Sequence, residues 1–563
     1  MLIGIDVGGT YTDGVVFDGD HILSSVKVPT DDNNLLQTLL QVLDELLNSL
    51  QNVDQISRIV LSTTLVTNIL ATGRGERTAL VLIPGFGLPH NAYQITTDTF
   101  FLNGAIDFRG REIEGLDENE IITLAQQIKK MNFKRVAVVG KFSNRNASQE
   151  LEIKELFQQI MPEVSIFTGS QVSNQLNFPR RAVTTFYTAM ILPEWINFAG
   201  QIEAALKSRG LQSEIHILKA DGGTMPLHKS LEKPCETVFS GPAASTMGAL
   251  AITMDTKNSV VVDIGGSTSD LSLMIDGQPL YASRGAEIEG KLTHVESFSL
   301  KSVALGGDSP IIYNHETGKV DIAASRLGPA ACFNGNAATV TDAFNQFYEL
   351  GLGDTKRSNN FLGEIAALAQ IPINELCDQV ISQVFERLET EIKAMFLQWE
   401  NEPAYRVWEV VNRSPFRLDR IIGIGAAAGI IVPQLARRLG VESVIHAYSP
   451  VANALGAAIV RPTMSVQLHI DTQQGICIAQ PGGEVESPGN LNNMQMEDAR
   501  KLAIEILAEQ AVQAGLQDYA QDYSIQMEEQ FNLIRSYHRS GKIFDVAVQI
   551  RPGFIHKYKG VKI

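Results

Sequence analysis

One short pattern occurs twice in this chain, once at its amino terminus and once near its middle. Both copies read Asp-x-Gly-Gly-Ser/Thr-x-Ser/Thr-Asp, and they begin at Asp6 and at Asp263. A run rich in β-branched residues precedes each copy, and a second apolar run that ends in Asp-Gly follows it. Each copy therefore predicts a strand, a tight loop, a second strand and a turn. Because the whole pattern is repeated, we expect two related half-domains.

The residue types in the repeated loop suit phosphate binding. Paired glycines let backbone N–H groups approach an anion without interference from a Cβ atom, and neighbouring hydroxyls add donors. A carboxylate at the end of the leading strand can hold a hydrated Mg²⁺ or orient a water. A glycine turn in a buried hairpin explains a single copy equally well, but two copies favour phosphate. The predicted phosphate-binding residues are Gly8, Gly9, Thr10, Thr12, Gly265, Gly266, Ser267 and Thr268, with Asp6 and Asp263 as metal ligands.

The segments that follow the first loop narrow the choice of nucleotide-binding fold. Rossmann and Walker loops open directly into a helix, whereas here a second strand follows each loop. Residues 21–28 then predict a third strand, and leucines at helical spacing predict a helix over 33–50. A meander followed by a helix is the opening of a ribonuclease-H-like half-domain, so a Rossmann or Walker site is disfavoured.

Small residues mark three later segments. Residues 240–245 form a small-residue loop that opens a helix, which suits either an anion or a closely packed crossing. Residues 421–429 predict a strand that turns through tiny residues into a helix, where a flat base and ribose fit unless this is only a tightly packed corner. Residues 452–458 place small residues on one helical face, as a close helix crossing requires. Residues 304–309 form a further glycine-rich stretch. The predicted nucleotide contacts in this stretch and in 421–429 are Gly306, Gly307, Gly423, Gly425, Ala426 and Ala427.

Composition excludes several classes of protein. The chain has 563 residues, of which 44% are hydrophobic and 19% charged, a balance typical of globular domains. Its net charge of −17 argues against a surface for nucleic acid or anionic membrane. The four cysteines are far apart, so a zinc cluster is disfavoured and reduced thiols are expected. The longest apolar run, 421–433, is too short to span a bilayer, and no signal segment precedes the first strand. We therefore expect a soluble, cytoplasmic protein.

Taken in order, these motifs resemble the actin, sugar-kinase and heat-shock chaperone ATPase superfamily, and more closely the hydantoinase A / 5-oxoprolinase family. The resemblance runs over most of the chain. It rests on nine segments in order: 3–13, 62–70, 77–87, 221–224, 240–244, 262–270, 328–332, 339–343 and 452–458.

The resemblance implies a fold and a division of the chain. The expected fold is α/β, with two ribonuclease-H-like, actin-like ATPase lobes that share a duplicated βββαβα core, and a small C-terminal α+β domain. The expected N-terminal lobe covers 1–178 and the second lobe covers 179–462, with an irregular insert at about 283–412. The C-terminal domain covers 463–563. A long helical stretch at 181–209 is expected to be interrupted at Pro193.

The activity that the resemblance implies is ATP-dependent opening of a cyclic amide such as 5-oxoproline or a hydantoin, with ATP and Mg²⁺ as cofactors. ATP phosphorylates the amide oxygen, water attacks the activated carbon, and the ring C–N bond breaks as phosphate leaves. Members commonly work with a B-type subunit or domain, which is absent here. A homo-oligomer is the other assembly that we consider. The candidate catalytic residues are Asp6, Asp13, Asn68, Asp263 and Lys301.

One departure from the family pattern bears on this activity. Where the family typically shows Asp-x-His-x-x-Gly-x-Gly-Gly-Gly-Ser, this chain has Ser299 and Lys301 in place of the Asp and the His. Two alternatives therefore stay open. One is a small-molecule kinase with the same ATP site, for which Asp13 or Asp221 is a candidate base. The other is a catalytically degenerate, nucleotide-binding regulatory subunit. An activator ATPase with an iron–sulfur cluster is disfavoured by the scattered cysteines.

Overall fold

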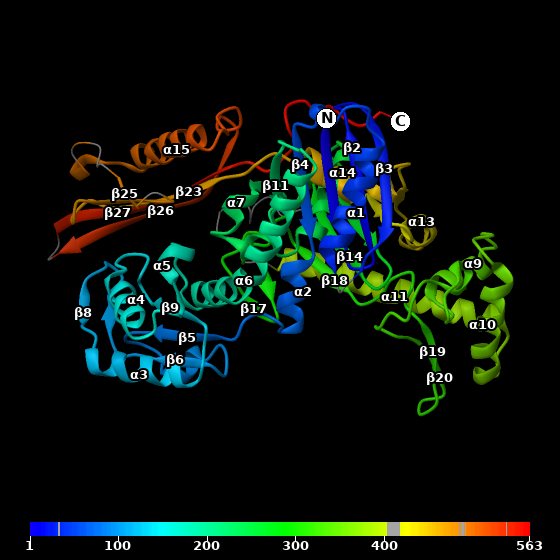
Figure 1. Cartoon of the computed structure of the whole chain (residues 1–563), viewed down its shortest axis with the longest axis horizontal. Coiled ribbons are helices and arrows are strands. Elements are labelled where there is room, and N and C mark those ends of the chain that lie inside the picture. Colours follow the sequence, from blue (N-terminus) through cyan, green and yellow to red (C-terminus); the bar gives the residue numbers. More distant parts are fainter. Residues whose placement is uncertain are drawn as a thin grey trace.

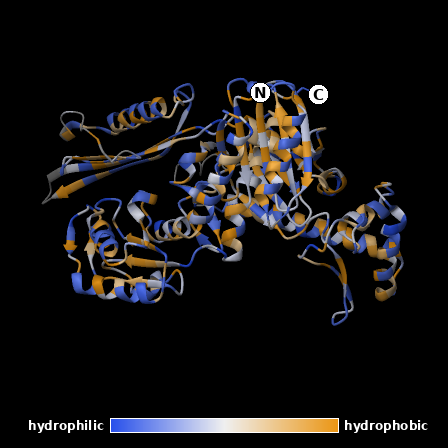
Figure 2. Ribbon diagram, in the orientation of Figure 1, coloured by the Kyte–Doolittle hydropathy of each residue, from blue (hydrophilic) through white to orange (hydrophobic). Residues whose placement is uncertain are grey.

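The computed structural model describes residues 1–31, 34–401, 417–481, 483–485, 489, 491–535 and 538–562. The protein is an α/β protein with a central two-lobed region, from which two peripheral parts and a C-terminal sheet extend (Figure 1). Apolar residues gather along the central strands, while the peripheral helices carry both apolar and polar residues (Figure 2). The N and C termini lie close together at the top of the central region (Figure 1).

The first lobe is built on a six-stranded sheet with the order β12-β11-β4-β1-β2-β3. β1, β2 and β3 form an antiparallel meander, and β1 pairs in parallel with β4. Helix α1 connects β3 to β4 and buries Leu39, Leu43 and Leu46 on its inner face. The elements are β1 (Leu2–Val7), β2 (Tyr11–Phe17), β3 (Ile22–Pro29), α1 (Leu35–Asn48), β4 (Arg58–Thr63), α2 (Leu65–Thr72), β11 (Glu214–Leu218) and β12 (Thr224–Pro226). The predicted βββαβα order is confirmed for this half.

The second lobe repeats the arrangement with the order β15-β14-β13-β21-β22. β13 pairs antiparallel with β14 and parallel with β21, as β1 pairs with β2 and β4. A further strand, β18, adds to β14. The elements are β13 (Ser259–Ile264), β14 (Ser269–Ile275), β15 (Gln278–Pro279), β18 (Leu300–Val303), β21 (Arg420–Ile424), α13 (Ala428–Leu439) and β22 (Glu442–Val444). The duplication inferred from the sequence is thus present in the backbone.

The sequence placed the junction of the lobes at residue 178, and the sheets divide the chain differently. β11 and β12 lie beyond that position but complete the first sheet, because β11 pairs in parallel with β4. Helix α6 (Phe178–Ser208) packs its Trp195 and Ile202 into the same core as β1. It also runs through Pro193 without a break, contrary to expectation. The Met190 carbonyl, three residues before that proline, accepts a hydrogen bond of 3.0 Å from the Glu76 N–H. A partner from outside the helix therefore binds a carbonyl in the turn that the proline disturbs.

Two helices cross between the lobes at backbone contact. α8 (Ser240–Thr253) leads into the second sheet, and α14 (Ala452–Ile459) packs against α8 and β1. A Cβ atom at Gly248 of α8 would lie 2.0 Å from the Ala452 carbonyl oxygen, and one at Gly456 of α14 would lie 2.3 Å from that of Ala244. A Cβ at Gly4 of β1 would lie 2.0 Å from the Ala454 carbonyl oxygen. The close crossing predicted for 452–458 is therefore confirmed.

Two peripheral parts extend from the lobes. A parallel sheet with the order β10-β9-β5-β6 is covered by α3 and α4 and lies at lower left in Figure 1. Its elements are β5 (Thr78–Ile83), β6 (Thr99–Phe101), α3 (Glu118–Lys130), β9 (Arg135–Gly140), α4 (Ser148–Ile160), β10 (Ser165–Thr168) and α5 (Gly169–Val172). The second part, at lower right, forms one core with the second sheet. Its elements are β19 (Ile311–Asn314), β20 (Lys319–Ile322), α9 (Val340–Phe347), α10 (Thr355–Ala369) and α11 (Ile373–Glu400).

The C-terminal domain is an antiparallel sheet with the order β25-β24-β23-β27-β26, covered by one helix. Its elements are β23 (Ser465–Asp471), β24 (Ile476–Gln480), β25 (Gly483–Glu484), α15 (Met496–Gln513), β26 (Tyr523–Arg535) and β27 (His538–Ile550). The segment after β27 returns to the first lobe, where Ile555 and Tyr558 pack with Phe17. The expected α+β tail is present, and its last residues belong to the core of another part of the chain.

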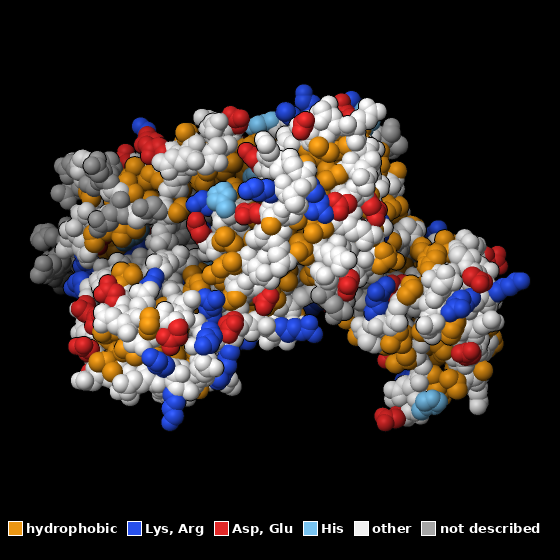
Figure 3. Space-filling view, viewed as in Figure 1, with side chains coloured by type: hydrophobic (Ala, Val, Ile, Leu, Met, Phe, Trp, Pro, Cys, Tyr) orange, Lys and Arg blue, Asp and Glu red, His pale blue; other side chains and the backbone are white. Residues whose placement is uncertain are grey.

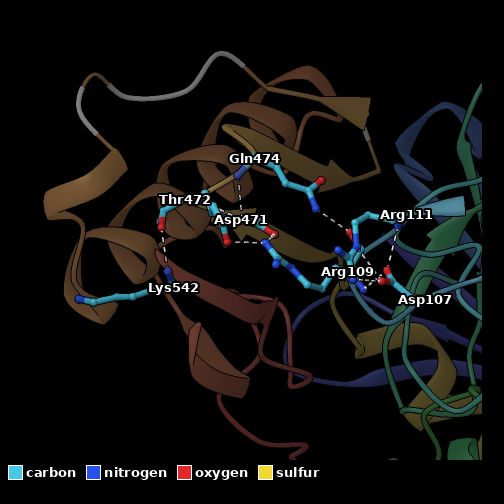
Figure 4. Close-up of polar contacts among 8 residues, drawn as sticks. Asp107, Arg109, Arg111, Asp471, Thr472, Gln474 and Lys542 are labelled. Carbon is cyan, nitrogen blue, oxygen red and sulfur yellow. Dashed lines mark hydrogen bonds and ion pairs between the residues drawn. The ribbon is translucent and has the colours of Figure 1, made fainter. Parts of the chain in front are cut away.

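The C-terminal domain docks on the parallel-sheet part through polar contacts. Arg109 lies on the turn between β7 (Ala105–Ile106) and β8 (Glu112–Glu114). Its guanidinium group is 3.8 Å from the Asp471 carboxylate, and its carbonyl accepts a hydrogen bond of 3.0 Å from the Gln474 side chain (Figure 4). Nearby, Arg145 binds Asp545 through two hydrogen bonds of 2.8 and 2.7 Å. Burial raises the pKa of Asp545, but Arg145 and His469 outweigh it and bring that pKa to about 2. These buried charges are therefore ionised and matched.

On the face shown in Figure 3, basic and acidic side chains are interspersed. Among the described residues, no helix has both the length and the apolarity to cross a lipid bilayer.

The helix crossing yields a prediction on stability. Gly248→Ala should destabilise the protein by about 2 kcal/mol or more, because its Cβ would meet a backbone carbonyl that cannot move without displacing α14. Gly200→Ala is the matched control. Gly200 is an exposed glycine of α6 with no other atom within 4 Å of its added Cβ, so alanine should stabilise by about 0.5–1 kcal/mol. Urea denaturation of both variants measures the two effects, and equal effects would contradict the close crossing.

Candidate active site

The two glycine loops meet at one large cleft between the lobes. The cleft has a volume of about 990 Å³ and is lined by both loops, by the first turn of α8 and by residues 425–427. The loops are so close that a Cβ atom at Gly266 would lie 2.7 Å from Thr10 Cγ2. Gly9 is different, because it is exposed and no other atom lies within 4 Å of its added Cβ. A ligand can therefore approach the Gly9 backbone directly.

Four aspartates line this cleft in matching positions. The pairing of β1 with β2 places Asp6 opposite Asp13, and the pairing of β13 with β14 places Asp263 opposite Asp270. Burial, together with the charges on Asp13 and Asp263, raises the pKa of Asp6 to about 6. Burial also raises the pKa of Asp263 and of Asp270 to about 6. The cleft thus concentrates negative charge that a cation would stabilise.

Three side chains from other elements hold these carboxylates. Asn453, at the start of α14, donates through its Nδ2 to Asp6 Oδ2 at 2.7 Å and to Asp13 Oδ2 at 2.9 Å. Lys27 of β3 pairs with Asp13 at 2.6 Å. The Ser245 hydroxyl of α8 donates to Asp263. Both crossing helices therefore contribute a side chain that orients a carboxylate.

One carboxylate oxygen is left over. Asp6 Oδ1 is buried and has no hydrogen-bond partner among the described residues. A Cβ atom at Gly241, in the first turn of α8, would lie 3.8 Å from it. A buried, unpartnered carboxylate oxygen beside a cleft is a place for a cation or a water.

The donor set fits Mg²⁺ with nucleotide phosphates. No group of three His, Cys, Asp or Glu side chains in the described ranges is clustered tightly enough to hold a metal alone. Mg²⁺ is commonly held by one or two carboxylates, with water and phosphate oxygens completing the octahedron. Asp6 and Asp263, one from each lobe, are suited to that role, and the open backbone at Gly9 and Gly265 leaves room for phosphates.

Most of the predicted site residues line the cleft, and three do not. Those that line it are Asp6, Gly8, Gly9, Thr10, Asp13, Asn68, Asp263, Gly265, Gly266, Ser267, Thr268, Lys301, Gly307, Gly425, Ala426 and Ala427. Thr12 is buried because strand alternation turns it away from the cleft, and its hydroxyl bonds to that of Thr30 at 2.9 Å. Gly423 lies inside β21 against Ile445, and Gly306 packs under the Gly266 carbonyl. The prediction of ligand contact is corrected for these three residues.

Asp221, the alternative candidate base for a kinase, also lies outside this cleft. It is buried, and its carboxylate accepts hydrogen bonds from Lys219 and Gln549, each at 2.9 Å. This arrangement leaves Asp13 as the kinase candidate in the cleft, where it is already paired with Lys27.

The segment that departs from the family pattern forms one wall of the cleft. The backbone N–H groups of Gly307 and Asp308 donate to the Gly265 and Gly266 carbonyls at 2.9 and 2.8 Å, which fixes this segment to the second glycine loop. Ser299 and Lys301 both line the cleft. Lys301, whose side chain is half exposed, lies 3.4 Å from Glu391 of α11. An ammonium group paired with a carboxylate thus stands where the family pattern has a histidine.

The sequence-based site omitted four residues. Asp270 repeats the position of Asp13 in the duplicated pattern, so the repeat itself contained that signal. Asn453 is the polar residue in an otherwise small and apolar helix, which was a weaker signal. Lys27 and Ser245 carry no local pattern. Only the pairing of β2 with β3 and the position of α8 bring them to the carboxylates.

Comparison with family models decides the membership of the chain. Residues 2–161 match the hydantoinase/oxoprolinase N-terminal region, and residues 181–465 match the hydantoinase/oxoprolinase model. The chain belongs to the hydantoinase/oxoprolinase family. These two matches exclude most of the C-terminal sheet, which starts at Ser465.

Relatives within the family include ATP-dependent enzymes and their subunits. The chain is 26% identical to an uncharacterised protein of Methanocaldococcus jannaschii, with 68% of this chain and 61% of that protein aligned. It is 23% identical to the caprolactamase subunit alpha of Pseudomonas jessenii, covering 79% and 68%. It is 24% identical to the 5-oxoprolinase of Saccharomyces cerevisiae, covering 81% of this chain but 40% of that enzyme. The chain therefore spans only part of the length of these relatives.

Two solved structures share the fold over nearly the whole chain. A nucleotide-free acetone carboxylase structure matches with a TM-score of 0.73 at 15% identity, covering 99% of this chain and 88% of that chain. The ATP-dependent caprolactamase from Pseudomonas jessenii matches with a TM-score of 0.71 at 17% identity, with the same coverage. The arrangement of lobes and C-terminal sheet is therefore a known one.

The aspartates yield a prediction on catalysis. Asp6→Asn and Asp263→Asn should each lower ATP turnover on the order of 100-fold while changing the Kd of ATP much less, because a carboxylate that handles Mg²⁺ or water acts mainly on charge that develops in the transition state. Asp276→Asn is the control, since Asp276 lies in the turn that ends the same repeat, outside the cleft. Phosphate release and equilibrium ATP binding measure the two quantities. Loss of ATP binding equal to the loss of turnover would contradict these roles.

Lys301 yields a second prediction. If its ammonium group binds ligand, Lys301→Ala should raise KM with a smaller effect on kcat. Glu391→Gln leaves the lysine in place without its ion pair, so it should have the opposite or no effect on KM. An exposed ion pair contributes at most about 1 kcal/mol, and both variants should remain folded. Steady-state kinetics with varied ATP and varied co-substrate measure this, and unchanged kinetics for both variants would show that position 301 has no part in binding.

Proposed function

We propose that this chain is the ATP-binding component of an enzyme that opens a cyclic amide of the hydantoin or 5-oxoproline type through phosphoryl activation of the amide oxygen. The observation that carries the proposal is the pair of glycine loops, one from each lobe, with four aspartates in matching register around one cleft. This arrangement suits a phosphate chain with a divalent cation, which is what activation of an unreactive amide requires. An amide is a poor electrophile because its nitrogen donates electron density to the carbonyl.

The relatives support this choice of reaction class. Caprolactamase and 5-oxoprolinase are named for lactam substrates, and the caprolactamase is ATP-dependent. The name of caprolactamase subunit alpha, and the 40% coverage of the yeast 5-oxoprolinase, indicate that further protein belongs to those enzymes. We therefore infer a B-type hydantoinase subunit as partner, which would complete the enzyme.

The residues of the cleft have distinct tasks in this proposal. Bound Mg²⁺-ATP would supply the phosphoryl group and offset its charge. Asp6 and Asp263 would hold the cation from the two lobes, and Asp6 Oδ1, which has no partner in the described part of the chain, is the oxygen available for it. Asn453 keeps Asp6 and Asp13 oriented, and Lys27 opposes the burial that raises the pKa of Asp13. The open backbone at Gly9 and the first turn of α8 present N–H groups to phosphate oxygens.

The wall at positions 299–302 is proposed to contact the amide substrate. Ser302 of β18 lies opposite Asp270, and Lys301 next to it points to Glu391. A hydroxyl and an ammonium group here donate hydrogen bonds, whereas the Asp and His of the family pattern would bind a metal or transfer a proton. The substrate of this chain is therefore expected to present acceptor oxygens to this wall.

A ring-substrate screen tests the proposal. Phosphate release from ATP should rise several-fold with at least one hydantoin or lactam, and a ring-opened product should form in a one-to-one ratio with phosphate. The screen is run with the chain alone and with a B-type protein encoded nearby, and the Asp263→Asn variant is the inactive control. A phosphorylated product would instead identify a kinase. ATP binding, seen as a rise in Tm, without turnover under any condition would identify a regulatory subunit.

A further inference from the structure

A second cavity lies outside the nucleotide cleft, where three parts of the chain meet. Its volume is about 320 Å³. The central lobe contributes Lys219, Asp221 and Glu236, the parallel-sheet part contributes residues 171–175, and the C-terminal sheet contributes residues such as Gln549. We call this space the junction cavity. Figure 1 shows α5 and β23, which both contribute to its lining, near one another to the left of the centre.

Most charges in the junction cavity are matched. Lys219 Nζ lies 2.9 Å from Asp221 Oδ2 and 3.6 Å from Glu236 Oε2. Asp221 also accepts hydrogen bonds from the Gly223 N–H and from the Gln549 amide, each at 2.9 Å. Glu236 has a second cation, Lys233, at 3.4 Å. These groups form a closed network that needs no ligand.

Three polar groups on the same wall are not matched. Glu296 is half-buried and makes no hydrogen bond or ion pair with any described residue. Burial and the charge of Asp221 raise its pKa to about 7, while the charges of Lys219 and Lys233 oppose this rise. His294 bonds to the Ser173 hydroxyl through Nδ1 at 2.8 Å, but its buried Nε2 has no partner within the described ranges. Thr188 is only 2% exposed, and its Oγ1 also has no hydrogen-bond partner among the described residues. Unpaired buried polar atoms are rare in folded proteins and each one costs stability. Their convergence on one cavity therefore points to a ligand.

The chemistry of these groups selects the ligand. Glu296 is an acceptor, and the Thr188 hydroxyl also accepts. Burial and the charges of Arg181 and Arg180 hold the pKa of His294 at about 3, although a contact with the Leu176 backbone opposes them, so the imidazole is neutral. Its Nε2 accepts a hydrogen bond in the tautomer whose proton is on Nδ1. A primary ammonium group has three N–H donors and one positive charge. It therefore matches three acceptors, one of which is the carboxyl group of Glu296.

We propose that the junction cavity binds a small molecule with a primary ammonium group, of about the size of an amino acid. A metal ion is a poorer fit, because no group of three His, Cys, Asp or Glu side chains in the described part of the chain can hold one. The remaining lining is rich in amides, including Gln467 and Gln480, with Lys233 at the side. These donors suit a carboxylate at the other end of the same molecule. Binding here does not depend on the proposed reaction, although opening of a lactam does generate an amine and a carboxylate.

The junction cavity is placed to influence the nucleotide cleft. His294, Val295 and Glu296 line the cavity, while the next residues, from Ser297 to Ser302, line the cleft. Phe298 packs so tightly on the turn after β11 that a Cβ atom at Gly222 would lie 2.3 Å from its Cζ. The Tyr281 hydroxyl beside it donates to the Asp221 carbonyl at 3.1 Å. One short segment thus separates the two spaces and contacts both.

The test uses four molecules of similar size and the full chain without nucleotide. The n-butylammonium ion and 4-aminobutyrate carry the ammonium group, whereas butyrate and n-butanol lack it. At millimolar concentrations the first two should raise Tm in a concentration-dependent way, and the last two should not. Calorimetric titration then gives the Kd. Because neither measurement uses ATP or turnover, failure here and failure of the proposed enzyme activity are distinguishable.

Two variants and a control assign the binding to this cavity. Glu296→Gln should weaken binding of the ammonium compounds at least 10-fold, and it should fold normally because it removes a carboxyl group that makes no hydrogen bond or ion pair with the described residues. Thr188→Val, which keeps the shape, should weaken binding less. Glu232→Gln is the control, since Glu232 is an exposed carboxylate at the same cavity and pairs with Lys229, and it should bind as the wild type does. No Tm shift with either ammonium compound, or an equal shift in Glu296→Gln, would overturn the proposal.

Discussion

The close crossing of α8 and α14 is the contact on which the two lobes depend. Backbone meets backbone at Gly248 and Gly456, and β1 joins the contact through Gly4. No side chain larger than hydrogen fits at these three positions, so the geometry leaves little freedom for the lobes to shift at this point. The same helices carry Ser245 and Asn453, which bind the carboxylates of the second and first lobe. Packing at the crossing therefore also sets the positions of the catalytic candidates.

The nucleotide cleft is electrostatically unfavourable when it is empty. Four aspartates around one cleft repel one another, and burial raises the pKa of three of them to about 6. The protein offsets part of this repulsion with Lys27 and with neutral donors, which orient the oxygens without cancelling all of the charge. The negative charge that remains can be neutralised by a divalent cation that binds together with phosphate. Strain of this kind is typical of sites whose task is to bind a charged ligand.

The parallel-sheet part and the C-terminal sheet both contribute to the wall of the junction cavity. The C-terminal sheet is held to the parallel-sheet part by Arg109 and by the buried Arg145–Asp545 pair. This docking shapes the junction cavity, because the two docked parts each supply some of its lining residues. The strip from His294 to Ser302 lines the junction cavity with its first three residues and the nucleotide cleft with the rest. Chemistry in the cleft and occupancy of the junction cavity can thus be coupled through a segment only a few residues long.

The sequence alone determined the local features of the protein, and these depend on short-range physics. Runs of β-branched residues and paired glycines predicted both hairpins, and the repeat predicted two related half-domains. Small residues at 452–458 predicted a close helix crossing. The glycine loops and Asp6, Asp13 and Asp263 followed from the same repeat, because strand periodicity decides which side of a sheet a residue faces. Thr12 and Gly423 show the limit, since both lie within good motifs yet are buried away from the cleft.

Only the tertiary structure decided the contacts between distant segments. The assignment of β11 to the first sheet depends on parallel pairing with β4, which lies about 150 residues earlier in the chain and which no local pattern encodes. The partners of the aspartates, Lys27 and Asn453, are brought in by a neighbouring strand and by a helix from the far end of the chain. The junction cavity exists only because three separate parts meet. Such arrangements follow from how apolar faces pack against one another, and many sequences satisfy the same local patterns without sharing that packing.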